Sequence, residues 1–411
     1  MQLFLDKLDS LVWNGFLIAA LLGTGVIYTV KLGGIQFRLP VLLAKNKNRR
    51  SSGLSQLKTV CMSLGASMGT GNIAGTAAAL AVGGAGSVFW MWVSAFLGMA
   101  LVYAENTLSA LYSDERVKGP MAYLSKGLGS GAAACFFAAC CVLSSFGMGG
   151  AAQVNTFAVS LGEYRYVPPL LTAVLVFIVI VLITGGGASR IGTAAQYLLP
   201  LATVAYTVVC LWVIGLNFGN IPSVFSRIFR EAFGLRQAAG GFSGYALAVG
   251  IRRGIFSNEA GLGSSPILHS AADSENDRTQ AGWSMFEVFF DTIFCCTLTA
   301  VTIMCACDTF SVSDALSSAL GDRVGLFLTA VNGRFALCTV IGWYYCGETS
   351  FLHLTKKRCR WVYCLLFAAV SASGALFAAR AVWTASDIFN GLMAVPNLMG
   401  LLLLINKVKK E

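Results

Sequence analysis

The sequence predicts an all-α polytopic membrane protein with eleven transmembrane helices. Hydrophobic residues make up 56% of its 411 positions and charged residues only 12%, a balance too apolar for a soluble enzyme of this length. Apolar runs long enough to cross about 30 Å of hydrocarbon recur along the chain, and two of them are interrupted by glycine and polar residues. The expected spans lie near residues 11–30, 59–82, 87–112, 132–160, 168–184, 191–216, 238–268, 282–307, 324–352, 361–379 and 386–406.

Basic residues lie mostly between these runs and predict the topology. The net charge of +10 therefore indicates loops at the surface of the lipid bilayer, and no nucleic-acid partner is expected. Lysine and arginine are concentrated on alternate loops, so the positive-inside rule places the chain in the cell membrane with its N-terminus outside and its C-terminus in the cytoplasm. Residues assigned to the cytoplasmic side include 45–50, Arg252, Arg253, 356–360 and 407–410.

The second run, 59–82, contains the stretch 69–72, Gly-Thr-Gly-Asn. Each glycine in a helix costs about 1 kcal/mol relative to alanine, and Asn72 adds an amide that has no reason to face lipid. One interpretation is a helix whose interruption forms part of a site, because unwound backbone at membrane depth survives only where it lines a cavity or is buried in protein. The other is close helix packing through the GxxxG pairs Gly65/Gly69 and Gly71/Gly75.

A second interruption, at residues 252–264, lies five spans later and in a span that enters from the opposite side. Two interrupted spans at corresponding positions of two halves indicate a secondary transporter with inverted repeats and a site near the midplane. This favours the broken-helix interpretation, in which Asn72 offers an oxygen to a small hard cation. The chain divides into an extra N-terminal span with a basic cytoplasmic loop (1–58), a first five-helix repeat (59–216) and a second, inverted repeat (217–411).

Three further polar residues lie inside spans. Counting about 1.5 Å per residue from near Gly282 places Asp291 roughly 13 Å deep, close to the midplane, where a carboxylate is costly and points to function. We expect Asp291 in a cation or substrate network. Gln153 and Asn155 in the fourth span fit either substrate contacts or hydrogen bonds between helices.

Thr339, Gly342 and Trp343 are three and four residues apart and therefore share one helix face. A hydroxyl, a bare backbone and a flat ring fit the wall of a small pocket. A tryptophan at a packed interface next to Gly342 explains the same pattern equally well. The thirteen cysteines show no metal-ligand spacing, and no organic cofactor is expected.

Three motifs carry a resemblance to a known family: 69–75 (GTGNIAG), 89–92 (FWMW) and 253–264 (RGIFSNEAGLGS). With further matches at 119–121, 387–390 and 396–398, the chain resembles the alanine or glycine:cation symporters, also called sodium:alanine symporters, along essentially its whole length. The resemblance implies a leucine-transporter-type fold, a ten-helix core of two inverted five-helix repeats in which core helices 1 and 6 are broken. The first span is then an N-terminal addition.

The resemblance also implies sodium-coupled import of a small neutral amino acid, alanine or glycine, by alternating access, and no enzymatic activity. Na+ is the implied coupling ion; proton coupling and altered specificity are the alternatives, ahead of a channel. The implied substrate-binding residues are Thr70, Gly71, Asn72, Gln153, Asn155, Phe256, Ser257, Thr339, Gly342 and Trp343, with Trp343 limiting substrate size. The implied sodium-binding residues are Gly65, Met68, Asn72, Asp291 and Thr292.

Two residues depart from the family pattern near the implied site. Ser67 stands where members often have a basic residue, and Gly150 stands where an asparagine often precedes the glutamine. Both departures make the substrate preference the least transferable part of the resemblance. The sequence carries no indication of the oligomeric state.

Overall fold

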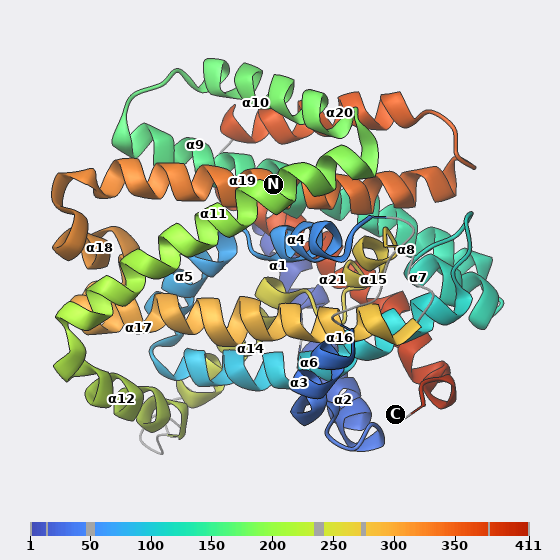
Figure 1. Ribbon diagram of the computed structural model, residues 1–411, viewed down its shortest axis with the longest axis horizontal. Helices are drawn as coiled ribbons and strands as arrows, with labels where there is room; N and C mark the ends of the chain where they lie inside the picture. The colour runs from blue at the N-terminus through green and yellow to red at the C-terminus, as the bar shows by residue number, and fades with distance from the viewer. Residues whose placement is uncertain are drawn as a thin grey trace.

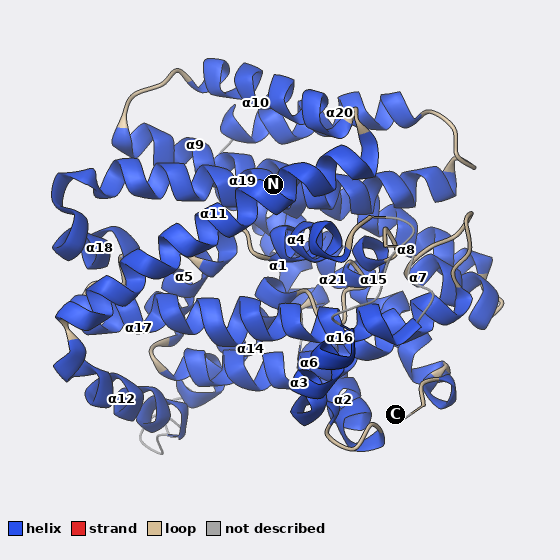
Figure 2. Cartoon of the chain, viewed as in Figure 1, coloured by secondary structure: helices blue, strands red, loops and turns tan. Residues whose placement is uncertain are grey.

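The computed structural model describes residues 2–13, 15–46, 54–233, 242–272, 277–376 and 379–409. Within these ranges the regular secondary structure is entirely helical (Figure 2). The long helices α6, α16, α17 and α19 run in one general direction across the view of Figure 1, and short helices lie at both ends of this bundle. The all-α prediction is therefore confirmed.

The helices of the N-terminal part lie between Gln2 and Phe233. Their bounds are α1 Gln2–Val12, α2 Gly15–Lys31, α3 Leu39–Asn46, α4 Gln56–Ser67, α5 Ala74–Gly83, α6 Gly86–Tyr112, α7 Pro120–Ala122, α8 Gly131–Ser144, α9 Ala152–Tyr164, α10 Pro169–Thr184, α11 Gly187–Leu216 and α12 Ile221–Phe233.

The helices of the C-terminal part begin at Phe242. Their bounds are α14 Phe242–Asn258, α15 Ser265–His269, α16 Asp277–Val288, α17 Thr297–Ala306, α18 Val312–Leu320, α19 Val324–Leu354, α20 Arg360–Ser373 and α21 Ala379–Leu403. Two π-helical stretches join consecutive helices into longer rods: Ser145–Ala151 (η4) between α8 and α9, and Phe289–Cys296 (η6) between α16 and α17.

Seven helical segments of the described chain are long and apolar enough to cross a membrane: Phe4–Lys31, Gly86–Tyr112, Gly131–Gly162, Gly187–Leu216, Thr279–Ala306, Val312–Leu354 and Trp383–Leu403. The four other expected spans correspond to α4 with α5, α10, α14 with α15, and α20, which are shorter or interrupted. The count of eleven crossings thus stays a prediction.

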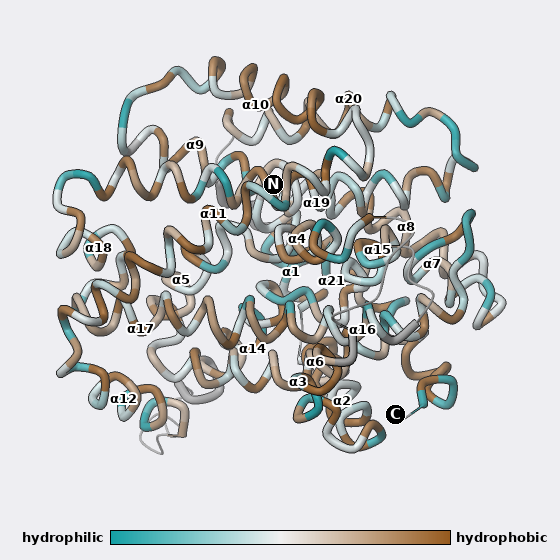
Figure 3. The backbone as a smooth tube through the Cα atoms, viewed as in Figure 1, coloured by the Kyte–Doolittle hydropathy of each residue, from teal (hydrophilic) through white to brown (hydrophobic). Residues whose placement is uncertain are grey.

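The packing between helices distinguishes an inner group of helices from an outer one. Helix α6 packs against α14 and α16, and α19 packs against α4, α8, α9 and α11, so these elements surround the middle of the bundle. Helix α10 lies at the edge of Figure 1 and is coloured hydrophobic along most of its length in Figure 3. Its exposed leucines, including Leu170 and Leu175, suit a surface in contact with lipid.

Candidate functional site

The second expected span, 59–82, is broken at the predicted place. Helix α4 ends at Ser67, Met68 and Gly69 leave the helical conformation, and a 3₁₀ turn over Thr70–Asn72 (η2) precedes α5. A Cβ at Gly65 would lie 3.0 Å from Cys338 Cβ, whereas one at Gly71 or Gly75 would meet nothing within 4 Å. Gly65 therefore serves close packing on α19, and the later glycines border open space.

The second broken span is interrupted by residues 259–264, between α14 and α15. Glu259, Gly261 and Gly263 all have positive φ, between 55° and 86°, a region that favours glycine. Asn258 caps the turn because its Oδ1 accepts a 3.0 Å hydrogen bond from the backbone N–H of Ala260. The backbone leaves the helix directly after the polar pair Ser257 and Asn258.

Asn72 in the first break contacts Asp291 in η6. Asn72 Nδ2 donates to Asp291 Oδ1 at 2.7 Å and to the Asp291 backbone carbonyl at 3.0 Å. Both residues are buried, and Asn72 Oδ1 has no hydrogen-bond partner within the described chain. A buried acceptor of this kind is costly unless a ligand meets it.

Asp291 also joins the second break to the first. Its Oδ2 accepts hydrogen bonds from Ser257 Oγ at 2.6 Å and from Thr292 Oγ1 at 2.8 Å. The π-helical geometry of η6 is of the kind often found at functional sites, because the wider turn re-aims side chains. One carboxylate thus connects α14, η2 and η6, in a position where the sequence predicted a functional acid.

A cavity of about 40 Å³ lies beside this junction. Its wall includes Gly71, Gln153, Phe256 and Ser257, four of the residues expected to bind substrate. The other lining residues are Ala66, Ser67, Gly69, Gly75, Met91, Met148, Arg253 and Trp383. Because a water molecule occupies about 30 Å³ in the liquid, this cavity must widen before it accepts an amino acid.

Gln153 holds the first break in place. Its Oε1 accepts hydrogen bonds from Thr70 Oγ1 at 2.9 Å and from the Thr70 backbone N–H at 3.3 Å, while its Nε2 donates to the Met148 carbonyl at 3.2 Å. Asn155 instead donates to the Gly374 carbonyl at 2.9 Å. Of the two alternatives raised for these amides, Asn155 makes a contact between helices and Gln153 touches both the break and the cavity.

Thr339, Gly342 and Trp343 are not among the residues that line the 40 Å³ cavity. Thr339 Oγ1 donates to the Gly65 carbonyl at 2.8 Å. A Cβ at Gly342 would lie 2.8 Å from Ala66 Cβ, which identifies a close helix contact. The three residues of this face therefore pack on α4 and on the second break.

Trp343 is fully buried and contacts Glu259 of the second break. Its Nε1 donates a 2.9 Å hydrogen bond to Glu259 Oε1. Its side chain covers Gly149, where a Cβ would come within 2.2 Å of Trp343 Cβ. Glu259 also accepts a 2.5 Å hydrogen bond from Ser264 Oγ, so the turn between α14 and α15 is held from both sides.

The five residues expected to bind sodium fall into two places. Asn72, Asp291 and Thr292 contact one another directly or through the Asp291 carboxylate. Gly65 lies toward Cys338 and Thr339 of α19, and Met68 follows the end of α4. The first group forms one polar cluster, and the second group borders α19.

The expectation that Arg252 and Arg253 belong to a basic loop between spans is wrong. Both lie inside α14, before its break. Arg252 Nη2 contacts Asp9 Oδ1 at 2.7 Å and Asp387 Oδ2 at 2.9 Å, and its guanidinium lies over the Trp13 ring. The helix continues through the arginine pair because these carboxylates compensate the Arg252 charge, and the contact with α1 puts the pair on the N-terminal side of the break.

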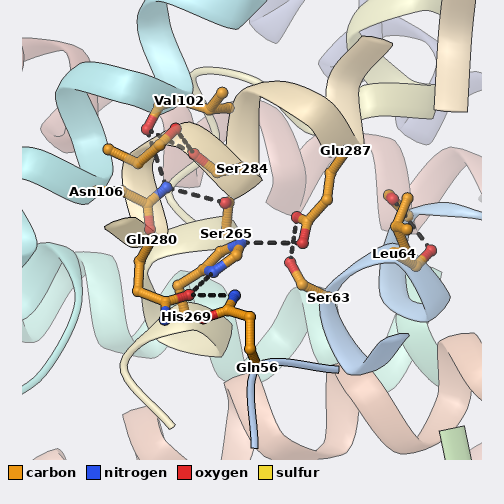
Figure 4. Close-up of polar contacts among 12 residues, drawn as sticks. Gln56, Ser63, Leu64, Val102, Asn106, Ser265, His269, Gln280, Ser284 and Glu287 are labelled. Atoms are coloured by element: carbon orange, nitrogen blue, oxygen red, sulfur yellow. Dashed lines mark hydrogen bonds and ion pairs between the residues drawn. The ribbon is translucent and has the colours of Figure 1, made fainter. Parts of the chain in front are cut away.

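A network of buried polar side chains ties α4 to α15 and α16 (Figure 4). His269 Nε2 lies 3.0 Å from Glu287 Oε1, and Ser63 Oγ donates to Glu287 Oε2 at 2.6 Å. Gln280 Oε1 lies 2.7 Å from His269 Nδ1, and the amides of Gln56 and Gln280 exchange hydrogen bonds of 2.9 and 3.3 Å. A doubly protonated imidazole satisfies both acceptors that face His269.

Three hollows follow one another from the breaks to this network. Ser67 lines both the 40 Å³ cavity and a cavity of about 10 Å³ whose wall includes Glu259 and Glu287. His269 and Gln280, on the other side of Glu287, line a third hollow of about 570 Å³. The His269–Glu287 pair therefore separates the inner cavities from the third hollow.

The two departures from the family pattern have different surroundings. Ser67 lines the 40 Å³ cavity, and its Oγ donates to the Leu64 carbonyl at 3.2 Å. At Gly150 a Cβ would come within 2.2 Å of Ser371 Oγ, so an asparagine cannot fit without movement of α20. The Ser67 change alters the cavity wall, and the Gly150 change permits closer packing.

Sequence reasoning missed Arg253, Glu259, His269 and Gln280 as contributors to the site. Arg253 and Glu259 could have been identified because they lie close in sequence to Ser257 and Asn258 in the interrupted span. His269 and Gln280 lie 11 residues apart, and nothing in their spacing indicates that they meet.

The chain is similar to known transporters along its whole length. The sequence model of the sodium:alanine symporter family matches residues 1–411. The chain is 36% identical to the sodium/alanine symporter AgcS of Methanococcus maripaludis, over 99% of this chain and 95% of that protein. It is 35% identical to the probable sodium/glutamine symporter GlnT of Bacillus subtilis, over 96% and 87% of the two chains.

Among solved structures, the fold is similar to that of MhsT in its complex with L-phenylalanine. The TM-score is 0.66, with 87% of this chain and 90% of MhsT covered and 16% sequence identity. MhsT has the leucine-transporter-type fold, so this likeness supports the expected fold class.

Proposed function

The chain belongs to the sodium:alanine symporter family, and from that premise we propose that it imports alanine or glycine together with sodium. It is a multi-pass membrane protein and an amino-acid:cation symporter, not an enzyme. The observation that carries the proposal is the Asn72–Asp291–Ser257 junction, where one buried carboxylate meets both helix breaks beside a cavity.

Sodium binds at this junction in our proposal. Asn72 Oδ1 is buried and has no hydrogen-bond partner within the described chain, and hard oxygen atoms of this kind suit a small cation. The Asp291 carboxylate supplies the charge, and Thr292 supplies a second hydroxyl beside Ser257. The carbonyls of Gly65 and Met68 are the candidates for a second cation position, toward α19.

The substrate binds in the 40 Å³ cavity after it widens. The unwound backbone of residues 69–72 offers free N–H groups to the substrate carboxylate. Gln153 orients Thr70, and Phe256 and Ser257 close the opposite wall. Arg253 adds a cationic group to the lining, and we assign it to the same carboxylate. Trp343 contributes by holding Glu259 and the second break.

In our proposal, alternating access depends on two closures, one on each side of the cavity, that open in turn. The Arg252–Asp9–Asp387 cluster closes the side of the N-terminus, and the His269–Glu287 network closes the other. We propose that substrate leaves through the hollow lined by His269 and Gln280 once the network opens. Ser63 and Gln56 must release Glu287 and Gln280 for α4 to move.

The proposed topology has eleven crossings, with the N-terminus outside and the C-terminus in the cytoplasm. The divisions at 58 and 216 are proposed to separate the N-terminal addition from two inverted repeats. Support comes from the two breaks, which interrupt α4/α5 and α14/α15 at corresponding positions of these halves. With this orientation the network of Figure 4 faces the cytoplasm.

Uptake of labelled alanine into proteoliposomes tests the proposal. We expect accumulation when sodium is higher outside, and no accumulation when potassium replaces sodium at the same pH. Accumulation driven by a proton gradient alone would reject sodium coupling, and the absence of alanine or glycine uptake under every gradient would reject the substrate assignment.

A further inference from the structure

A separate groove of about 590 Å³ lies between α9, α10, α11 and α19. The residues that line it are different from those of the cavity beside the breaks. Its wall is apolar except for Thr172, Thr329 and Arg334. Leu175 and Val179 of α10 line it and are exposed, so it opens on the surface assigned to lipid.

The three polar residues come from the N-terminal parts of two helices, Thr172 from α10 and Thr329 and Arg334 from α19. Arg334 Nη1 donates to the Ala330 carbonyl at 2.8 Å, so the guanidinium reaches back one turn along α19 to the level of Thr329. Thr172 lies in the first turn of α10. At about 1.5 Å per residue, the apolar remainder extends from Ala330 to Val340 over about 15 Å.

Arg334 carries a charge that the described part of the protein does not balance. Its one hydrogen bond there is to the Ala330 carbonyl, and no ion pair with a described carboxylate is formed. A half-buried cation beside an apolar surface in a membrane is costly unless an anion or water meets it. An anionic group at the level of Thr329 would compensate this charge.

We propose that this groove binds one anionic phospholipid of the surrounding bilayer. The phosphate meets Arg334 with Thr172 and Thr329 beside it, and one acyl chain extends along the apolar wall toward Val340. The polar end and the apolar length match the two parts of such a lipid. In the proposed topology this end of α19 is external, so the lipid belongs to the outer leaflet.

Native mass spectrometry of the purified full-length protein tests the site. Wild-type protein is taken from nanodiscs that contain equal amounts of phosphatidylglycerol and phosphatidylcholine with the same acyl chains. We expect phosphatidylglycerol to be retained about fivefold more than phosphatidylcholine, the ratio given by one arginine near the membrane surface. In Arg334→Gln the two lipids should be retained equally, and Arg334→Lys should keep most of the preference.

Two further variants separate the charge from the groove. Arg323→Gln removes an exposed arginine near the same end of α19, outside the groove, and should retain lipid as the wild type does. Leu337→Trp fills the apolar part and should lower phosphatidylglycerol retention although Arg334 is present. Equal retention of both lipids by the wild type, an undiminished preference in Arg334→Gln, or recovery of a free fatty acid in place of phospholipid would overturn the proposal.

Discussion

Asn72 and Asp291, 219 residues apart in the sequence, share a 2.7 Å hydrogen bond at the meeting point of the two broken helices. The bond uses the amide nitrogen of Asn72 and leaves its oxygen for a ligand. Ser257, from the other break, binds the second oxygen of the same carboxylate. In our proposal a cation at this junction contacts residues of η2, η6 and the end of α14 together, and this shared contact links cation binding to the geometry of both breaks.

Replacing Asn72 by alanine should abolish sodium-dependent alanine uptake. The substitution removes the free oxygen and leaves Asp291 without one of its donors, and an unsatisfied buried group costs about 1–3 kcal/mol, which corresponds to about 5-fold to 150-fold in binding. Uptake into proteoliposomes with and without a sodium gradient measures the effect. Asn217→Ala, at the end of α11, is the matched control and should transport normally; wild-type sodium stimulation in Asn72→Ala would reject the site.

Substrate size should be controlled by Phe256, which lines the cavity, and not by Trp343, which does not. We expect Phe256→Ala to admit larger neutral amino acids. Trp343→Phe keeps a ring but loses the donor to Glu259, and should lower the transport rate without widening the range. Competition by a panel of neutral amino acids measures both. A wider range in Trp343→Phe, as the sequence pattern alone implied for this position, would return Trp343 to the cavity wall.

Removing the Gln280 amide should weaken the His269–Glu287 network, which in our proposal closes the side of the cavity away from the N-terminus. Gln280→Ala loses the contacts with Gln56 and His269, so α4 keeps only the Ser63–Glu287 hydrogen bond of this network to α16. Hydrogen exchange of α4 amides should become several-fold faster. Gln196→Ala on α11 serves as the control and should leave α4 exchange unchanged. Unchanged exchange in Gln280→Ala would mean that other contacts hold the closed state.

The loop after α6 should show an acid-dependent contribution to stability. The Lys126 ammonium, 2.6 Å from Asp114, and the backbone N–H groups of Val117 and Arg116 lower the pKa of Asp114 from 3.8 to about 2. Since the folded pKa is below the unfolded one, the stabilisation is present above pH 4 and is lost as the pH falls toward 2. The pair is exposed, so the effect is small.

A Tm series on wild type and Asp114→Asn checks this contribution. The wild type should have the slightly higher Tm between pH 5 and 7, and the difference should shrink below pH 4. Asp322→Asn, in the exposed turn before α19, is the matched control for the loss of one exposed carboxylate. A constant difference between wild type and Asp114→Asn down to pH 3 would contradict the assignment.

The sequence was sufficient for the local features of the site. Glycines and an amide in an apolar run predicted the break at 69–72, and depth along a span singled out Asp291, which is buried and contacts that break. Each depends on neighbours along the chain, where the helical period and the cost of burial apply directly.

Contacts between residues that are far apart in the sequence could not be predicted from it. The pairing of Arg252 with Asp9 and Asp387 keeps α14 helical where the charge suggested a loop, and those partners are 243 and 135 residues away. Trp343 was placed on the correct helix face, but whether that face meets a cavity or Glu259 depends on how α19 packs against the second break. The π-helical turn at Asp291 likewise has no local sequence signature.

We propose that Asp291 couples sodium to substrate, and the sodium dependence of alanine binding in the wild type and in Asp291→Asn tests this role. In detergent-purified wild type, saturating sodium should tighten alanine binding at least about tenfold, and by linkage alanine should tighten sodium binding equally. Asp291→Asn, which keeps the shape but removes the charge, should bind alanine weakly and equally in sodium and potassium, while Asp322→Asn behaves as the wild type. Undiminished sodium dependence in Asp291→Asn would show that Asp291 does not couple sodium to alanine binding.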